Sequence, residues 1–214
     1  GEYISLGYYE RDDIDVVVQY LRDSNKVSMI GLWGRSMGAV TTLMHADRDH
    51  SLAGICLDSP FADLSLLSKE LVSSRSPVPL PDFIVEETFQ AIRETIKQKA
   101  GFDIYDLNPL KNNVSKSFIP AYFISAKDDE LIAHYHAKML HDHYQGDKHY
   151  KLVEGTHNSQ RPQFIIDSII IFFINCFSVA GKDKDGMFSP EGVKGQSTGG
   201  FNPDVHGFMT EDEM

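Results

Sequence analysis

Hydrophobic residues along the chain fall into short strand-like runs separated by helical patterns. Apolar positions recur every three or four residues in the segment 11–22, on a face formed by Ile14, Val17, Val18 and Leu21. The same spacing predicts helices at 39–46, 61–72, 83–100, 134–144 and 164–177. Runs with the length and pattern of strands occupy residues 27–33, 51–58, 120–126 and 149–153. This alternation predicts an α/β fold with a mostly parallel sheet flanked by helices.

The remaining segments predict the domain organisation. Residues 73–82 contain three prolines and are expected to form a turn and linker, and residues 101–118 are expected to be a loop. We interpret residues 1–180 as one domain in which the segment 61–119 is a cap-like insertion between two strands. Residues 181–214 are rich in Gly, Ser, Asp and Lys and are expected to be a flexible acidic tail.

The first predicted strand and its helix flank Gly34-Arg35-Ser36-Met37-Gly38, a G-x-S-x-G pattern. Between a strand and a helix, this pattern predicts a nucleophile elbow, a strained turn that lifts the serine hydroxyl clear of the sheet. We expect Gly34 and Gly38 to allow close approach of the strand and the helix, where any side chain would clash. The backbone N–H of Met37 opens the helix and is the predicted oxyanion donor.

A serine nucleophile needs a general base, and the base needs an orienting carboxylate. With such an elbow, the acid and then the histidine follow the serine along the chain, each at the carboxyl end of a strand. His157 follows the last predicted strand and is the expected base. Asp128 and Asp129 follow the 120–126 strand, and Asp58 ends the 51–58 strand, so their positions leave three candidates for the acid. The other two would be loop or turn carboxylates.

Three longer phrases make the comparison with a known family specific. GLWGRSMGA at 31–39, GICLDSPFADL at 54–64 and EGTHNSQRPQF at 154–164 resemble a group of plant and protist α/β-hydrolases labelled serine-aminopeptidase-like or bem46-like. The resemblance covers about residues 1–177 and implies the α/β-hydrolase fold. Aligned with the family pattern around the acid, it also favours Asp129 over Asp128 and Asp58, with Ile132 as the aliphatic residue that follows the acid.

These residues predict a serine hydrolase. Ser36 would attack a carbonyl, His157 would move the proton, Asp129 would orient His157, and the N–H of Met37 would stabilise the oxyanion. The expected substrate is an ester, thioester or amide in a small molecule, lipid or peptide, and the mechanism needs no metal or organic cofactor. The alternative is a catalytically silent, hydrolase-like scaffold that binds a partner or ligand.

The beginning of the chain differs from the family pattern. In this fold, several strands and the loop that donates the second oxyanion N–H precede the elbow. The chain begins in a stretch that follows that loop in the family, and we expect these N-terminal strands to be absent from it. The 27–33 strand would then form an apolar open edge of the sheet.

Composition narrows the classes of partner. The 214 residues include 31 acidic and 20 basic side chains, with a formal net charge of −11 and no basic cluster. We therefore expect neither nucleic acid nor an anionic membrane as a main partner. Cys56 and Cys176 lie in apolar segments and are expected to be buried thiols in a reducing compartment, which predicts a cytoplasmic location.

Two segments invite other interpretations. The apolar stretch 164–177 is interrupted by Asp167 and is shorter than a bilayer requires, so we expect a helix packed on the sheet and no integral membrane segment. The helix at 134–144 carries four histidines. His136 and His143 are two turns apart, which is wider than the usual spacing of zinc ligands on one helix, so we expect a solvated helix face rather than a metal site.

Overall fold

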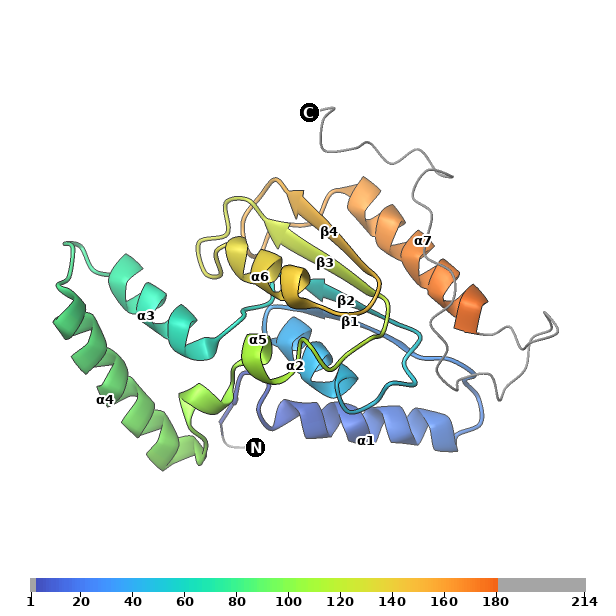
Figure 1. Ribbon diagram of the computed structural model, residues 1–214, viewed down its shortest axis with the longest axis horizontal. Coiled ribbons are helices and arrows are strands. Elements are labelled where there is room, and N and C mark those ends of the chain that lie inside the picture. Colours follow the sequence, from blue (N-terminus) through green and yellow to red (C-terminus); the bar gives the residue numbers. More distant parts are fainter. Residues whose placement is uncertain (1–2, 181–214) are drawn as a thin grey trace.

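The computed structural model describes residues 3–180, which form a four-stranded parallel sheet with helices on both faces (Figure 1). The predicted acidic tail, residues 181–214, lies outside the described residues. The strands pair in chain order, each parallel to the next: β1 (Gly31–Arg35), β2 (Gly54–Asp58), β3 (Ala121–Ala126) and β4 (Lys148–Val153). All four predicted strands are confirmed, and β1 begins and ends later than the apolar pattern indicates. Because the strands are parallel, the loops that follow them meet at one end of the sheet, beyond the carboxyl ends of the strands.

The predicted helices are also present. They are α1 (Glu10–Asp23), α2 (Met37–Ala46), α3 (Leu64–Ser74), α4 (Asp82–Ala100), α6 (Tyr135–His143) and α7 (Gln163–Ala180). The segment 101–118 was expected to be a loop, but it contains the 3₁₀ turn η1 (Ile104–Asp106) and the short helix α5 (Pro109–Asn112). Both have capping residues: Asp103 accepts the N–H of Tyr105 at 3.1 Å, and Asn108 accepts the N–H of Lys111 at 2.9 Å.

Alternate side chains of the strands build a core on each face of the sheet. On the face covered by α2, α5 and α6, the buried residues include Leu43, Leu57, Phe123 and Leu140. On the face covered by α7, they include Cys56, Ile124, Ile169, Phe172 and Cys176. Both cysteines are free and buried, as expected. Burial raises the pKa of the Cys56 thiol well above its usual value and that of Cys176 to about 12, so both are held as unreactive thiols.

Helix α7 packs on the sheet as predicted, but it is longer than the apolar stretch in the sequence. It has 18 residues, of which 22% are buried. By length and composition it is the one helix within residues 3–180 that is apolar enough to cross a membrane. The argument from insufficient length is therefore wrong for this helix. Core helices of soluble proteins have the same length and composition.

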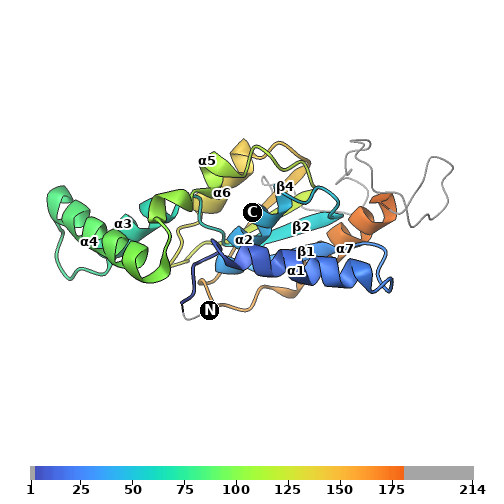
Figure 2. The ribbon, with the colours of Figure 1, turned by 90° about the horizontal axis from the view of Figure 1, so that it is seen from below.

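Of the segment between β2 and β3, the part that contains α3 and α4 stands beyond the carboxyl ends of the strands. Helices α3 and α4 lie to one side of the sheet in both views, next to each other and apart from α1 and α7 (Figures 1 and 2). A separate hydrophobic cluster joins them to α2 and to the loop after β3, and it contains Val40, Met44, Phe61, Leu64, Leu67, Phe89 and Ile132. Helices α3 and α4 are thus attached at the end of the sheet where the loops that follow the strands meet.

Strand β1 is one edge of the sheet. Within residues 3–180 it pairs with β2 alone, and Trp33 on it is 46% exposed. Beside it, α1 exposes Val16, Val17 and Tyr20. The described part of the protein therefore has the open apolar edge that the sequence predicts.

Candidate active site

Ser36 lies in the turn between β1 and α2, at the N-cap of the helix. Its backbone has φ 54° and ψ −121°, a conformation that costs a non-glycine residue energy. The turn is held from both sides. The Ser36 N–H donates to the carbonyl of Asp58 at 2.8 Å, and the Ser36 carbonyl accepts from Ala39 and Val40. This is the strained strand–turn–helix geometry expected of a nucleophile elbow.

The two glycines of the motif have different environments. A Cβ on Gly34 would lie 2.1 Å from the carbonyl oxygen of Gly38 and 2.6 Å from the amide nitrogen of Ala39. A Cβ on Gly38 would meet no atom of the described residues within 4 Å. The expected close approach is therefore confirmed for Gly34. For Gly38 it is wrong within the described residues, because its Cα–Cβ direction points into open space.

Gly34→Ala is expected to destabilise the protein by roughly 3 kcal/mol or more, because the clashing atoms belong to the backbone of α2 and cannot rotate away. Gly38→Ala is the matched control and is expected to stay within about 1 kcal/mol of the wild type. Urea denaturation of the full-length protein measures both variants. Equal destabilisation by the two substitutions would contradict the assignment of the close contact to Gly34.

Met37 is the first residue of α2 and is half-buried. Its N–H is one of the amides that the first turn of a helix leaves without an intrahelical acceptor. The N-terminal end of a helix also favours negative charge. The position is therefore suited to the predicted role of Met37 as an oxyanion donor.

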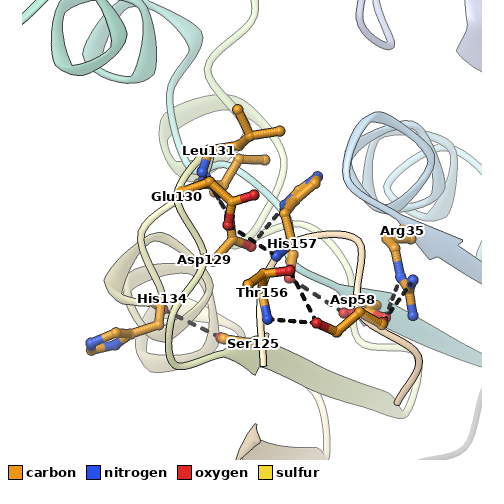
Figure 3. Close-up of polar contacts among 12 residues, drawn as sticks. Arg35, Asp58, Ser125, Asp129, Glu130, Leu131, His134, Thr156 and His157 are labelled. Carbon is orange, nitrogen blue, oxygen red and sulfur yellow. Dashed lines mark hydrogen bonds and ion pairs between the residues drawn. The ribbon is translucent and has the colours of Figure 1, made fainter. Parts of the chain in front are cut away.

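The predicted acid and base are in direct contact. His157 Nδ1 lies 2.7 Å from Asp129 Oδ2, and the two side chains are 5% and 1% exposed (Figure 3). The other carboxylate oxygen of Asp129 accepts the N–H groups of Leu131 at 3.0 Å and Ile132 at 2.8 Å. Both carboxylate oxygens of Asp129 are thus held by hydrogen bonds. The ring of His157 is held through its Nδ1.

These contacts keep Asp129 ionised. Burial raises the pKa of its carboxyl group, but the hydrogen bonds from His157, Ile132 and Leu131 and the charge of His157 outweigh burial and lower the pKa below its ordinary value of 3.8. A carboxylate that is charged and fully hydrogen-bonded is suited to orienting a histidine and to stabilising its protonated form.

The other two candidate acids do not contact His157. Asp128 is exposed, and its backbone N–H donates to the Gly155 carbonyl at 3.0 Å. Asp58 is fully buried, but its carboxylate binds Arg35 and Arg161. Of the three, Asp129 is therefore the one whose carboxylate orients His157.

The elbow and the His157 loop lie at the same end of the sheet, beyond the carboxyl ends of the strands. Arg35, the last residue of β1, donates to the Ser159 carbonyl at 3.4 Å and to Asp58 at 2.7 Å. Within the described residues no hydrogen bond joins Ser36 directly to His157.

Two arginines lie at this end of the sheet that the sequence pattern does not predict as site residues. Arg35 occupies a variable position of the G-x-S-x-G pattern, and Arg161 follows His157 by four residues in a polar loop. Both bind the buried carboxylate of Asp58 (Figure 3 shows Arg35 and Asp58). The available signal was Asp58 itself, because a carboxylate that ends a fully buried strand requires a cationic partner.

The histidines of α6 differ from the expected solvated face. His143 is exposed, but His136 is fully buried. His136 Nε2 lies 2.9 Å from the carboxylate of Glu70 on α3, and its Nδ1 accepts the N–H of Ala62 at 3.2 Å. The prediction is thus wrong for His136, which joins α6 to α3. Within residues 3–180 no group of three or more His, Cys, Asp or Glu side chains is arranged to hold a metal ion.

Comparison with known proteins identifies the fold. No protein-family model matches the chain. The chain is 32% identical over 168 residues to the uncharacterized protein YqkD of Bacillus subtilis, a match that covers 73% of this chain and 51% of that protein. The chain thus spans about half the length of this curated relative.

Solved structures of hydrolases share the architecture. The esterase Pf2001 of Pyrococcus furiosus superimposes with a TM-score of 0.57 at 18% identity, over 82% of this chain and 65% of that one. An α/β-fold family hydrolase of Bacillus anthracis gives a TM-score of 0.52 at 12% identity, over 81% of this chain and 76% of that one. The chain therefore has the α/β-hydrolase fold, as the sequence predicts. The bem46-like subgroup remains a prediction.

Proposed function

We propose that this α/β-hydrolase-fold chain carries the Ser36, His157 and Asp129 triad of a serine hydrolase. The observation that carries the proposal is the buried hydrogen bond of 2.7 Å between His157 and Asp129, at the end of the sheet where the strained turn presents Ser36. A buried acid–base pair beside an elbow serine is the combination that nucleophilic acyl transfer requires.

The reaction follows from the hydrogen bonds of His157. Because its Nδ1–H donates to Asp129, its Nε2 is the nitrogen that accepts the proton of Ser36. As the Oγ of Ser36 bonds to the substrate carbonyl carbon, the proton moves to Nε2 and the carbonyl oxygen becomes an oxyanion, stabilised by the N–H of Met37. Collapse of this intermediate breaks the bond to the leaving group, which takes the proton from Nε2. Water then cleaves the acyl-enzyme by the same steps.

The substrate class is an ester, thioester or amide of a small molecule, lipid or peptide. The Pyrococcus furiosus neighbour is an esterase, which favours an ester. We assign the segment 61–119 as a cap over the site, because α3 and α4 stand at the carboxyl ends of the strands. The resemblance of the elbow and of the Asp58 and His157 segments supports membership of the bem46-like subgroup, and the two buried thiols support a cytoplasmic location.

The test is covalent labelling of the full-length protein with a fluorophosphonate, which reacts only with an activated serine. Peptide mapping by mass spectrometry is expected to locate a single adduct on Ser36. Ser59 is an internal control, because it also follows a strand with a positive φ of 51° but lies beside Arg161 rather than next to a general base. An adduct elsewhere, or none on a folded protein, would contradict the proposal and favour a binding scaffold.

A further inference from the structure

Arg161 is a buried cation in the loop that carries His157. The loop connects β4 to α7, and Arg161 lies in it just before the helix, with a side chain that is fully buried. Burying a guanidinium group costs free energy unless every donor is paired. Its surroundings show what the protein gains from this position.

The guanidinium group of Arg161 donates hydrogen bonds both to the end of the sheet and to the His157 loop. Nε and Nη2 donate to the carboxylate of Asp58, the Nη2 bond measuring 2.8 Å, and Nη2 also contacts Ser59 Oγ at 3.2 Å. Nη1 donates to the carbonyl of Thr156, the residue before His157, at 3.1 Å. One rigid group thus ties the last residue of β2 to the backbone that carries the base.

Asp58 is a fixed anchor for this contact. It is fully buried at the end of β2. Nε of Arg35, at the end of β1, donates to its Oδ2 at 2.7 Å. Its backbone carbonyl accepts the N–H of Ser36 at 2.8 Å. The residue that Arg161 holds is therefore the residue that also holds the nucleophile turn.

We propose that Arg161 is a positioning residue that sets the His157 backbone against the Ser36 turn through Asp58. This rests on the proposed function. A loop without regular structure has few contacts of its own, and the planar, bidentate geometry of arginine fixes both the distance and the orientation of the two backbones. An error of about 1 Å in such an arrangement lowers the rate by about 10²-fold.

The experiment compares Arg161→Ala with the wild type in the full-length protein, with a short-chain ester as substrate and a fluorophosphonate as label. We expect kcat and the labelling rate per folded molecule to fall by about 10²-fold with little change in KM. Millimolar guanidinium is expected to restore part of the lost rate by filling the vacated space. Arg22→Ala is the matched control, because Arg22 also pairs with an aspartate, Asp49, through α1 rather than the His157 loop, and it is expected to keep its rate with or without guanidinium.

The outcomes separate the two proposals. A wild type that is not labelled at Ser36 overturns the proposed function and this inference with it. A labelled wild type and a folded Arg161→Ala variant that reacts at the same rate overturn the inference alone. So does a loss of activity that follows only the unfolded fraction. If Arg161→Ala does not fold, Arg161→Lys carries the test: it keeps the charge beside Asp58 but not the bidentate geometry, and it is expected to be slow and folded.

Discussion

Replacing His157 with alanine is expected to lower kcat of the full-length protein by about 10⁶-fold. Without the imidazole nothing accepts the proton of Ser36, and a neutral hydroxyl is a poor nucleophile. The residual rate would come from binding and from the N–H of Met37. Steady-state hydrolysis of a short-chain ester, together with the rate of fluorophosphonate labelling, measures the effect.

Two further variants make this result specific to the triad. His143→Ala removes an exposed histidine of α6 and is expected to leave kcat unchanged. The double variant Ser36→Ala with His157→Ala is expected to be no slower than either single variant, because the two residues act as one unit. Additive losses in the double variant, or an active His157→Ala protein, would show that His157 is not the base for Ser36.

Asp129→Asn is expected to lower kcat by about 10⁴-fold while the protein stays folded. An amide can donate its N–H to Nδ1 of His157, which stabilises the tautomer whose Nε2 carries the proton and cannot accept that of Ser36. The variant also lacks the charge that stabilises protonated His157. Hydrolysis and labelling rates measured beside a thermal unfolding curve separate this effect from loss of structure.

Asp128→Asn is the matched control for the acid. It changes the adjacent, exposed carboxylate and is expected to leave the rate unchanged. The pH dependence of protein stability gives a second check on the state of Asp129. Because the pKa of Asp129 is lowered in the folded protein, its contribution to stability is fully present above the ordinary value of 3.8 and is lost only as the pH falls through the lower, folded value. Asp129 therefore stays charged at neutral pH. A rate loss in Asp128→Asn equal to that in Asp129→Asn would contradict the assignment.

The parts of the site that follow from local order could be read from the sequence. The elbow needs only a strand, five residues and a helix in succession, and Asp129 and His157 each follow a strand whose apolar run is visible. Parallel pairing then brings both loops to the same end of the sheet, which is why the contact between the candidate acid and the candidate base can be predicted from the sequence alone. Selecting Asp129 over Asp128 needed the family resemblance, since adjacent carboxylates look alike in a pattern.

The parts that depend on contacts between distant segments could not be read in this way. Arg161 and Asp58 are 103 positions apart, and no periodicity relates them. His136 has the spacing of an exposed helix position, but α3 covers it and supplies Glu70. At Gly38 the motif implies a crowded position, whereas the described neighbours leave it open. Each of these depends on what a second element brings to the residue, which a single stretch of sequence does not contain.

Phe89 is the one fully buried residue of helix α4. The Phe89 ring makes an edge-to-face contact with Tyr105, and the amino group of Lys69 lies 4.8 Å from its centre. Most of the remaining surface of the helix faces outward, and ion pairs of Glu86 with Lys69 and of Arg93 with Asp103 add to its attachment. Its exposed positions can therefore diverge while Phe89 and these pairs are kept. Under the proposed cap assignment, selectivity and chemistry would be separable traits: exchanging this helix for that of a relative would alter which acyl group is chosen without changing Ser36, Asp129 or His157.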